Sequence, residues 1–337
     1  MKTLARIALI GVSLCIAVAK AADAPATQPA TQPLVLPGNG LAQHSFLFTG
    51  EWDYRRPVQT IYIIRDGKVT WSYDIPFKDA TGTMQELGEA KLLANGNVLF
   101  CRKTGAREVD QDKKTVWNYD CPAGTEVHSV QPIGLDKVLM VQSGNPAVAS
   151  IINITTGKTE KTLTLPTGHP DKPHMQFRRV RLLPDGNFLV AHSDMGKVCE
   201  YDPDGKEIWS VPAPQVWAAL RLSNGNTLIS CQQRGVKEVN HAGETVWELT
   251  QKDVPDIKLY ICQEAHRLSN GNTVICNWCP NNIKDPKKWP GSVQVFEVTP
   301  DKKLVWALSS WSDPDLGPAS SIQLLDDPNM PECDAIK

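Results

Sequence analysis

Asn224-Gly225-Asn226-Thr227-Leu228-Ile229 is a tight turn followed by an apolar strand, and the chain repeats this pattern. Closely similar segments occupy residues 95–100, 185–190 and 270–275. Asn-Gly and Asp-Gly supply the positive φ angles that tight hairpins require. The repeats therefore predict a series of antiparallel hairpins.

A tryptophan four residues after a polar turn marks the later part of the repeat. The tryptophans at this position are Trp71, Trp117, Trp209, Trp247 and Trp306, and a weaker copy carries Lys161 instead. The marks recur every 38 to 59 residues or so, about the length of one four-stranded propeller blade. The spacing predicts one blade per repeat.

The strand composition agrees with this fold. The second strand of each repeat is apolar over several consecutive residues, as expected for a strand buried on both faces. The outer strands alternate, as at residues 68–73, and no helical period is present in the repeats. We therefore predict an all-β propeller, with six four-stranded blades as the favoured count and seven as the alternative.

The two ends of the chain complement each other. The first repeat starts at residues 45–48 without an innermost strand, whereas residues 321–327 resemble the inner strand at 180–185. We expect the C-terminal strand to complete the N-terminal blade, which removes two exposed sheet edges. The alternative is a disordered tail.

The N-terminus has the pattern of a secretory signal peptide. Lys2 and Arg6 precede an apolar run at 7–18, and Ala19-Lys20-Ala21 forms a cleavage site. The run is too short for a membrane anchor, which is the alternative. We therefore expect a signal peptide at 1–21, a Pro/Ala/Thr-rich linker at 22–38 and one propeller domain at 39–337. The mature protein would be periplasmic or extracellular, with no transmembrane segment.

The net charge argues against nucleic-acid binding, and the cysteine spacing argues against a zinc site. A net charge of −2 over 337 residues argues against a nucleic-acid partner. The pair Cys276 and Cys279 has no second C-x-x-C to complete a zinc site, so no metal site is expected. Export favours at least one disulfide that involves Cys276 or Cys279.

Three segments carry a family resemblance. Residues 221–228 and 267–274 resemble the repeat of arylsulfotransferase-like propellers, and residues 202–209 resemble the tryptophan-docking repeat of PQQ-type propellers. The resemblance covers most of residues 44–327 and implies the architecture.

Neither family's active site carries over residue by residue to this chain. Quinoprotein dehydrogenases have about eight blades and often a Cys-Cys pair, which this chain lacks, so we expect no PQQ and no other cofactor. The histidine nucleophile of arylsulfotransferases would fall near Glu264 and His266, where the motif differs.

Long loops indicate the functional face. The elaborated loops at 50–57, 76–87, 166–176, 277–291 and 310–319 should share one face of the ring, and binding residues usually lie on such loops. Aromatic residues outside the repeat position gather on this face: Trp52, Tyr54, Trp217, Tyr260, Trp278, Trp289 and Trp311. They either stack on a ligand or form small local cores under the loops.

Polar residues at the starts of inner strands are the other candidates. They are Glu89, His128, His174, Arg178, Arg179, Glu264 and His266. Arginine there suits a carboxylate, sulfate or phosphate, and histidine suits a ligand or a proton-transfer role. The alternative is that each is a solvated rim residue or a satisfied channel residue.

Three functions fit these features. The leading hypothesis is an exported, non-enzymatic propeller that binds a carbohydrate or another small molecule on the long-loop face. An enzyme that uses the same face, such as a lyase, hydrolase or transferase, is the second. A scaffold that binds another envelope protein is the third.

Overall fold

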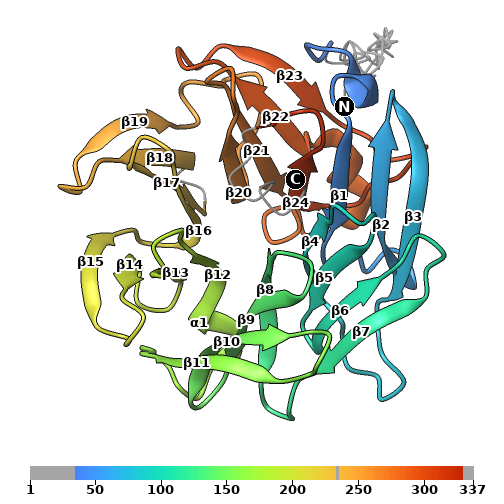
Figure 1. Cartoon of the computed structure of the whole chain (residues 1–337). Helices are drawn as coiled ribbons and strands as arrows, with labels where there is room; N and C mark the ends of the chain where they lie inside the picture. The colour runs from blue at the N-terminus through green and yellow to red at the C-terminus, as the bar shows by residue number, and fades with distance from the viewer. Residues whose placement is uncertain (1–34, 233–234, 329–337) are drawn as a thin grey trace, which may run out of the picture. The chain divides into compact units, whose positions relative to one another are not determined.

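The computed structural model describes residues 35–232 and 235–328, which form six four-stranded sheets. Neighbouring strands pair antiparallel. Figure 1 shows the sheets arranged around a ring, each with one strand nearest the centre. The six-bladed all-β propeller predicted from the repeats is confirmed.

The strands of each blade are given from the centre outward. Blade 1 comprises β24 (Ala319–Leu324), β1 (Phe46–Gly50), β2 (Val58–Arg65) and β3 (Lys68–Pro76). Blade 2 comprises β4 (Leu87–Leu92), β5 (Val98–Arg102), β6 (Gly105–Val109) and β7 (Thr115–Asp120). Blade 3 comprises β8 (Glu126–Ile133), β9 (Lys137–Ser143), β10 (Ala147–Asn153) and β11 (Thr159–Leu165). Blade 4 comprises β12 (Phe177–Leu182), β13 (Phe188–His192), β14 (Lys197–Tyr201) and β15 (Glu207–Pro212). Blade 5 comprises β16 (Val216–Arg221), β17 (Thr227–Cys231), β18 (Gly235–Val239) and β19 (Thr245–Leu249). Blade 6 comprises β20 (Ile261–Arg267), β21 (Thr273–Trp278), β22 (Val295–Val298) and β23 (Leu304–Leu308). The helices are η1 (Gly40–Ala42), α1 (Pro173–Gln176) and η2 (Pro286–Gly291).

The hairpin turns form as their sequence requires. Gly225 has a φ of 84°, a conformation that side chains with a Cβ rarely adopt. The backbone N–H of Leu222 donates to the Asn226 carbonyl at 2.8 Å, and the Asn224 side chain accepts from the Asn226 N–H at 2.9 Å. The short turn thus directs the chain from β16 into the fully buried strand β17.

Blade 1 is completed by the C-terminal strand. β24 pairs with β1, with Phe48 opposite Ile322, and the Leu325 N–H donates to the Ser45 carbonyl at 2.7 Å. Both Phe48 and Ile322 are fully buried in a core cluster shared with blade 6. The predicted closure of the ring by the two ends of the chain is confirmed.

The repeat tryptophans dock between blades. Four of them donate their indole N–H to a carbonyl in the next blade or in η1: Trp71 to Gln111 at 3.0 Å, Trp209 to His241 at 2.8 Å, Trp247 to Pro300 at 2.8 Å and Trp306 to Gly40 at 2.9 Å. The outer strand of one blade is therefore fixed to the neighbouring unit by a hydrogen bond as well as by packing.

The propeller begins slightly earlier than the sequence indicates. Leu36 packs against the core cluster of blades 5 and 6, and the Pro37 carbonyl accepts from the Ala307 N–H at 3.1 Å. The end of the expected linker is thus part of the propeller. The signal peptide at 1–21 lies outside the described residues, and the described part of the chain has no helix of the length and hydropathy that a membrane span needs.

The expected disulfide is not found among the described residues, where Cys276 and Cys279 are both free, buried thiols. They do not pair with each other because residues three apart along an extended segment project to opposite sides. Burial raises the pKa of the Cys279 thiol to about 11, which keeps it protonated and unreactive.

Candidate functional site

One face of the ring, here called the loop face, carries the connections between blades and the loops between second and third strands. All five long loops expected there fall at such positions. A sixth, at 250–260 between β19 and β20, was not among the expected loops, although Pro255-Asp256 within it is a turn signal.

A β-bulge interrupts every inner strand near the loop face. The register shifts where these strands begin, and the unpaired residues are Ser320, Gly88 and Glu89, His128, Arg178 and Arg179, Trp217, and Gln263. Bulges re-aim side chains and are common beside functional sites. β-Bulges therefore orient five of the candidate residues identified from the sequence: Glu89, His128, Arg178, Arg179 and Trp217.

The first polar group is buried along the ring axis. Glu89 contacts Arg179 at 3.3 Å and Arg181 at 2.7 Å, and Glu264 contacts Arg181 at 3.6 Å and His266 at 3.3 Å. None of these side chains is more than 4% exposed. The axial network thus joins blades 2, 4 and 6 through buried charged side chains.

The charge of Glu264 is stabilised inside this network. Burial alone would raise the pKa of Glu264, but Lys91, His266 and Arg179 hold it well below its usual range. Lys91 Nζ lies 4.0 Å from Glu264 Oε1. The carboxylate is therefore a fixed negative charge at the axis.

The second polar group, here called the histidine–carboxylate centre, consists of Glu86, Glu126, His128, His174 and Arg178. Glu126 Oε2 lies 2.8 Å from His128 Nε2 and 2.9 Å from His174 Nδ1. Arg178 Nη2 lies 3.1 Å from His174 Nε2, and Arg178 Nη1 is 3.9 Å from Glu86 Oε1. The two histidine rings meet edge to face at 5.3 Å.

Three blades and one helix position this centre. Glu86 directly precedes β4, Glu126 and His128 begin β8, and Arg178 is in the bulge of β12. His174 lies in α1, which Gln176 anchors by two hydrogen bonds to the backbone of Gly144, at 2.7 and 3.0 Å. A short helix held in this way can present His174 over the strand ends.

Burial and neighbouring charges set the protonation of the centre. Burial and the nearby Glu51 raise the pKa of Glu86 to about 7. Burial and the Arg178 charge lower the pKa of His128 to about 4. Burial opposes the charge of Glu126, but hydrogen bonds from His128 and His174 lower its pKa far more. The centre thus holds neutral His128 against a firmly ionised carboxylate.

Two charged residues of the centre keep polar atoms unmatched. Glu86 is 4% exposed and Arg178 is 8% exposed. Among the described residues, Glu86 Oε2 and the Nε and Nη1 atoms of Arg178 have no hydrogen-bond partner. Unsatisfied buried charged groups are costly, so these atoms are suited to an external partner.

The aromatic candidates form two clusters. Trp217 and Trp278, 5% and 4% exposed, pack with Ile261 and the half-buried Trp52. Trp289 is fully buried and contacts Tyr54 at 5.1 Å and Trp311 at 6.4 Å between ring centroids. Packing under loops, one of the two alternatives, therefore accounts for Trp217, Trp278 and Trp289.

The remaining aromatic residues keep some exposure. Tyr54 is 44% exposed, and Trp52, Tyr260 and Trp311 are half-buried. The Arg178 guanidinium lies 4.7 Å from the ring centre of Trp217. This cation–π contact fixes Arg178 and links the aromatic sector to the histidine–carboxylate centre.

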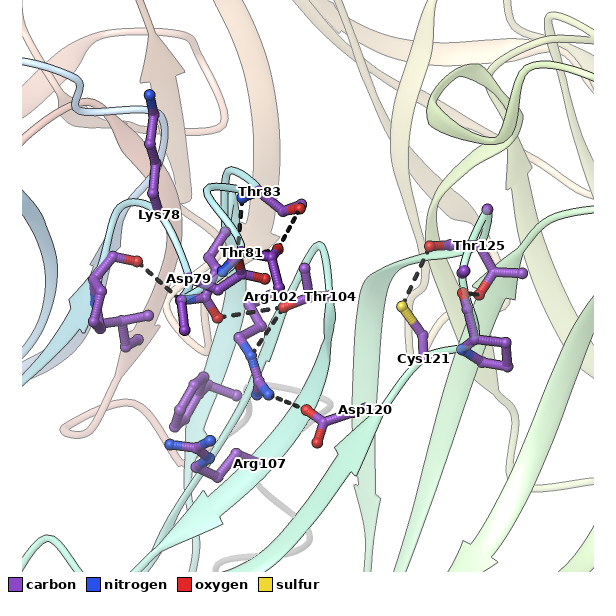
Figure 2. A pocket seen from close by; sticks show the side chains of 18 of the residues that line it. Lys78, Asp79, Thr81, Thr83, Arg102, Thr104, Arg107, Asp120, Cys121 and Thr125 are labelled. Carbon is purple, nitrogen blue, oxygen red and sulfur yellow. Dashed lines mark hydrogen bonds and ion pairs between the residues drawn. The ribbon is translucent and has the colours of Figure 1, made fainter.

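A cleft of about 750 Å³ lies beside the centre, between blades 1 and 2. Figure 2 shows Arg102 and Asp120 pointing toward each other in it, with an ion pair of 2.6 Å. Gln85 and Thr125 line the cleft, and the residues that follow them, Glu86 and Glu126, belong to the centre.

Several members of these groups were not predicted from the sequence: Glu86, Lys91, Glu126 and Arg181, together with the neighbouring Lys103. Lys103 Nζ lies 3.0 Å from Glu126 Oε1, on the side away from the histidines. Glu126 carried a usable signal, because residues two apart in a strand share a face and it precedes His128 by two. Glu86 carried none, since it stands in a loop.

Comparisons with known proteins support the architecture. Residues 172–278 match a PQQ-type family model described as outer membrane protein assembly factor BamB. No curated protein gave a match. A protein of unknown function from Bacteroides caccae superposes with a TM-score of 0.70 at 24% identity, covering 83% of this chain and 97% of that one.

Two lyases are more distant structural neighbours. A catalytically inactive virginiamycin B lyase from Staphylococcus aureus, crystallised with quinupristin, superposes with a TM-score of 0.52 at 12% identity, covering 77% of this chain and 84% of that one. A streptogramin B lyase gives 0.51 at 10% identity, with 80% and 85% covered. These likenesses concern the fold. The matched repeats and the six blades support a PQQ-like β-propeller repeat architecture for this chain.

Proposed function

We propose that this chain is an exported binding propeller that takes a small anionic ligand at the histidine–carboxylate centre of the loop face. A carboxylated sugar, such as a uronic acid unit of a glycan, is the class we favour. The observation that carries the proposal is the pair of buried, incompletely bonded charged side chains, Glu86 and Arg178.

The unmatched atoms define the ligand's chemistry. Among the described residues, the Nε and Nη1 atoms of Arg178 make no hydrogen bond, so each could donate to an oxygen of an anionic ligand. Glu86 Oε2 likewise accepts no hydrogen bond from the described residues, and a ligand hydroxyl would donate to it. An acidic sugar combines both groups in one small molecule.

The surroundings favour a fixed site. Trp217 holds the Arg178 guanidinium by a cation–π contact at 4.7 Å, and Gln176 anchors the helix that bears His174. Preorganised side chains lose less entropy when a ligand binds. The exposed Tyr54 and the half-buried Trp311 offer further apolar surface on the same face.

Binding is tested with the mature chain on an array of neutral and uronic-acid glycans, followed by calorimetry on hits. Arg178→Gln should weaken binding by about tenfold or more, which corresponds to about 1.4 kcal/mol. Arg107→Gln, in the cleft of Figure 2, is the matched control and should bind like the parent. Loss of binding in the Arg107 variant alone would move the site to the cleft and contradict the proposal.

The same assay examines the enzyme alternative. Chromatography of the incubated glycan should recover it unchanged if the protein only binds. Cleaved or eliminated products would make the chain an enzyme that uses this face.

A protein partner in the cell envelope is the second candidate. The match of residues 172–278 to a model described as an outer membrane assembly factor favours it. Crosslinking in intact cells should capture a specific envelope protein if this function holds, and Arg178→Gln should leave that capture intact if glycan binding is separate.

A further inference from the structure

We propose that Glu126, His128 and His174 hold a divalent metal ion of the zinc type, in the histidine–carboxylate centre. The metal site rests on the proposed function in one respect only, namely that the anionic ligand binds beside the metal. No motif in the sequence announces this group, because its members come from β8 and from α1, 48 residues apart.

The three side chains already converge. One ligand atom from each, the Glu126 carboxylate oxygen, His128 Nε2 and His174 Nδ1, lie within 4.8 Å of one another. Two imidazole nitrogens and one carboxylate oxygen form a donor set that Zn²⁺ uses when a fourth position stays open. Metal–ligand bonds of about 2.0–2.2 Å need these atoms to separate slightly from their present hydrogen bonds.

A second observation points to the open position. Glu86 is 4% exposed, its Oε2 atom has no hydrogen-bond partner among the described residues, and this atom lies 3.8 Å from His174 Nδ1. A metal ion, or water bound to one, would supply the missing partner. Glu86 is therefore placed as a fourth ligand or as an acceptor for metal-bound water.

The local charge suits a cation. Glu51, Glu86 and Glu126 bring three carboxyl groups to the site, against the cations of Lys103 and Arg178. Lys103 contacts the other oxygen of Glu126, Oε1, at 3.0 Å. The oxygen that faces the histidines is thus left for the metal.

Metal binding requires both histidines to change tautomer. His128 Nε2 carries the proton that it donates to Glu126 Oε2, and coordination through Nε2 moves this proton to Nδ1. Arg178 can only donate, so His174 Nε2 accepts and Nδ1 carries the ring proton, which it donates to Glu126. Coordination through Nδ1 moves this proton to Nε2 through solvent, with no net release. Arg178 Nη2 then loses its acceptor at His174 Nε2, while the guanidinium keeps its contact with Trp217. The bound metal would thereby free Nη2 for the anionic ligand.

The test uses full mature protein without a histidine tag, dialysed against chelator and titrated with ZnCl₂ by calorimetry. We expect one ion per chain. His174→Ala should lower the affinity at least about tenfold, since even outer partners of a metal site contribute that much. His169→Ala is the matched control: His169 is exposed in the loop before α1, and its loss should leave the affinity unchanged.

Cobalt gives an independent measurement, because a tetrahedral Co²⁺ complex with these ligands absorbs in the visible range and the His174 variant should lose that band. Circular dichroism checks that each variant is folded. Absence of stoichiometric binding, or equal affinity in the His174 variant, would overturn the metal site. Glycan binding by the chelated protein would then leave the proposed function standing, whereas metal binding without any glycan hit would contradict only that function.

Discussion

Glu89 and Arg181 form a 2.7 Å ion pair between inner strands of blades 2 and 4, which are not neighbours in the ring. Glu89 Oε1 also accepts a hydrogen bond from the Val130 N–H in blade 3 at 2.6 Å. A single buried carboxylate thus joins three blades at the axis. Glu89→Gln removes the charge that balances buried Arg179 and Arg181, and should lower the free energy of unfolding by about 3–5 kcal/mol.

Urea unfolding of the parent and the variant measures this effect. The control is Glu160→Gln, because the exposed Lys137–Glu160 pair has a similar distance of 2.8 Å. Exposed pairs contribute little, so this change should leave the midpoint nearly unmoved. Equal shifts of the urea midpoint in the two variants would show that the buried axial pair stabilises the fold no more than the exposed pair does.

The fold could be predicted because its signals are local. Asn224-Gly225 turns and the tryptophan spacing act within one blade, and the resemblance of residues 321–327 to an inner strand gave the closure. The loop face followed from strand direction alone, which does not depend on the details of packing.

The site could be predicted only in part, because it depends on how blades meet. His128, His174 and Arg178 were singled out, but their shared partner Glu126 and the unmatched Glu86 were not. Their proximity arises from bulges and from the closed ring, which no local pattern encodes. The buried tryptophans were ambiguous for the same reason, since exposure depends on which loops cover them.

Ring closure makes a prediction about stability. Ile322 in β24 is fully buried between blades 1 and 6, so Ile322→Ala should cost about 2–5 kcal/mol of unfolding free energy. Ile208→Ala is the matched control, since Ile208 lies on the outer strand β15 and is 49% exposed. Chemical denaturation compares the two, and similar small losses would mean that β24 contributes little to the closed ring.

His44 makes the closure depend on pH. Its ring bridges Glu297 at 2.9 Å and Asp326 at 3.2 Å. Burial alone would lower the pKa of His44, but the hydrogen bonds and charges of the two carboxylates raise it above the ordinary value of 6.5. Because the folded pKa is higher than the unfolded one, this stabilisation is complete below about pH 6.5 and is lost as the pH rises through the folded pKa.

Thermal unfolding of the parent and of His44→Asn across a pH series tests this sign. The difference in Tm should be largest at the acidic end and shrink toward alkaline pH. His241→Asn, at an exposed turn, should give a difference that does not vary in this way. A difference in Tm that widens as the pH rises would contradict a raised pKa of His44 in the folded protein.

Trp278 distinguishes packing from ligand stacking in the aromatic sector. It is 4% exposed, packs with Trp217 and Ile261, and donates its indole N–H to the Glu51 carbonyl at 3.2 Å. Trp278→Ala should therefore lower the free energy of unfolding by about 3–5 kcal/mol. Tyr54→Ala, at a ring that is 44% exposed on the same face, should cost less than about 1 kcal/mol.

Glycan affinity, measured well below the melting temperature of each variant, completes the comparison. If Trp278 only packs, its variant should bind within a few-fold of the parent while it remains folded, and any larger loss should fall on Tyr54→Ala, whose ring a ligand can reach. A folded Trp278 variant of parent-like stability that no longer binds would instead assign this ring to the ligand. The indole would then have to leave its pocket beside Glu51 to reach a ligand, and the fluorescence of the free and bound protein would differ accordingly.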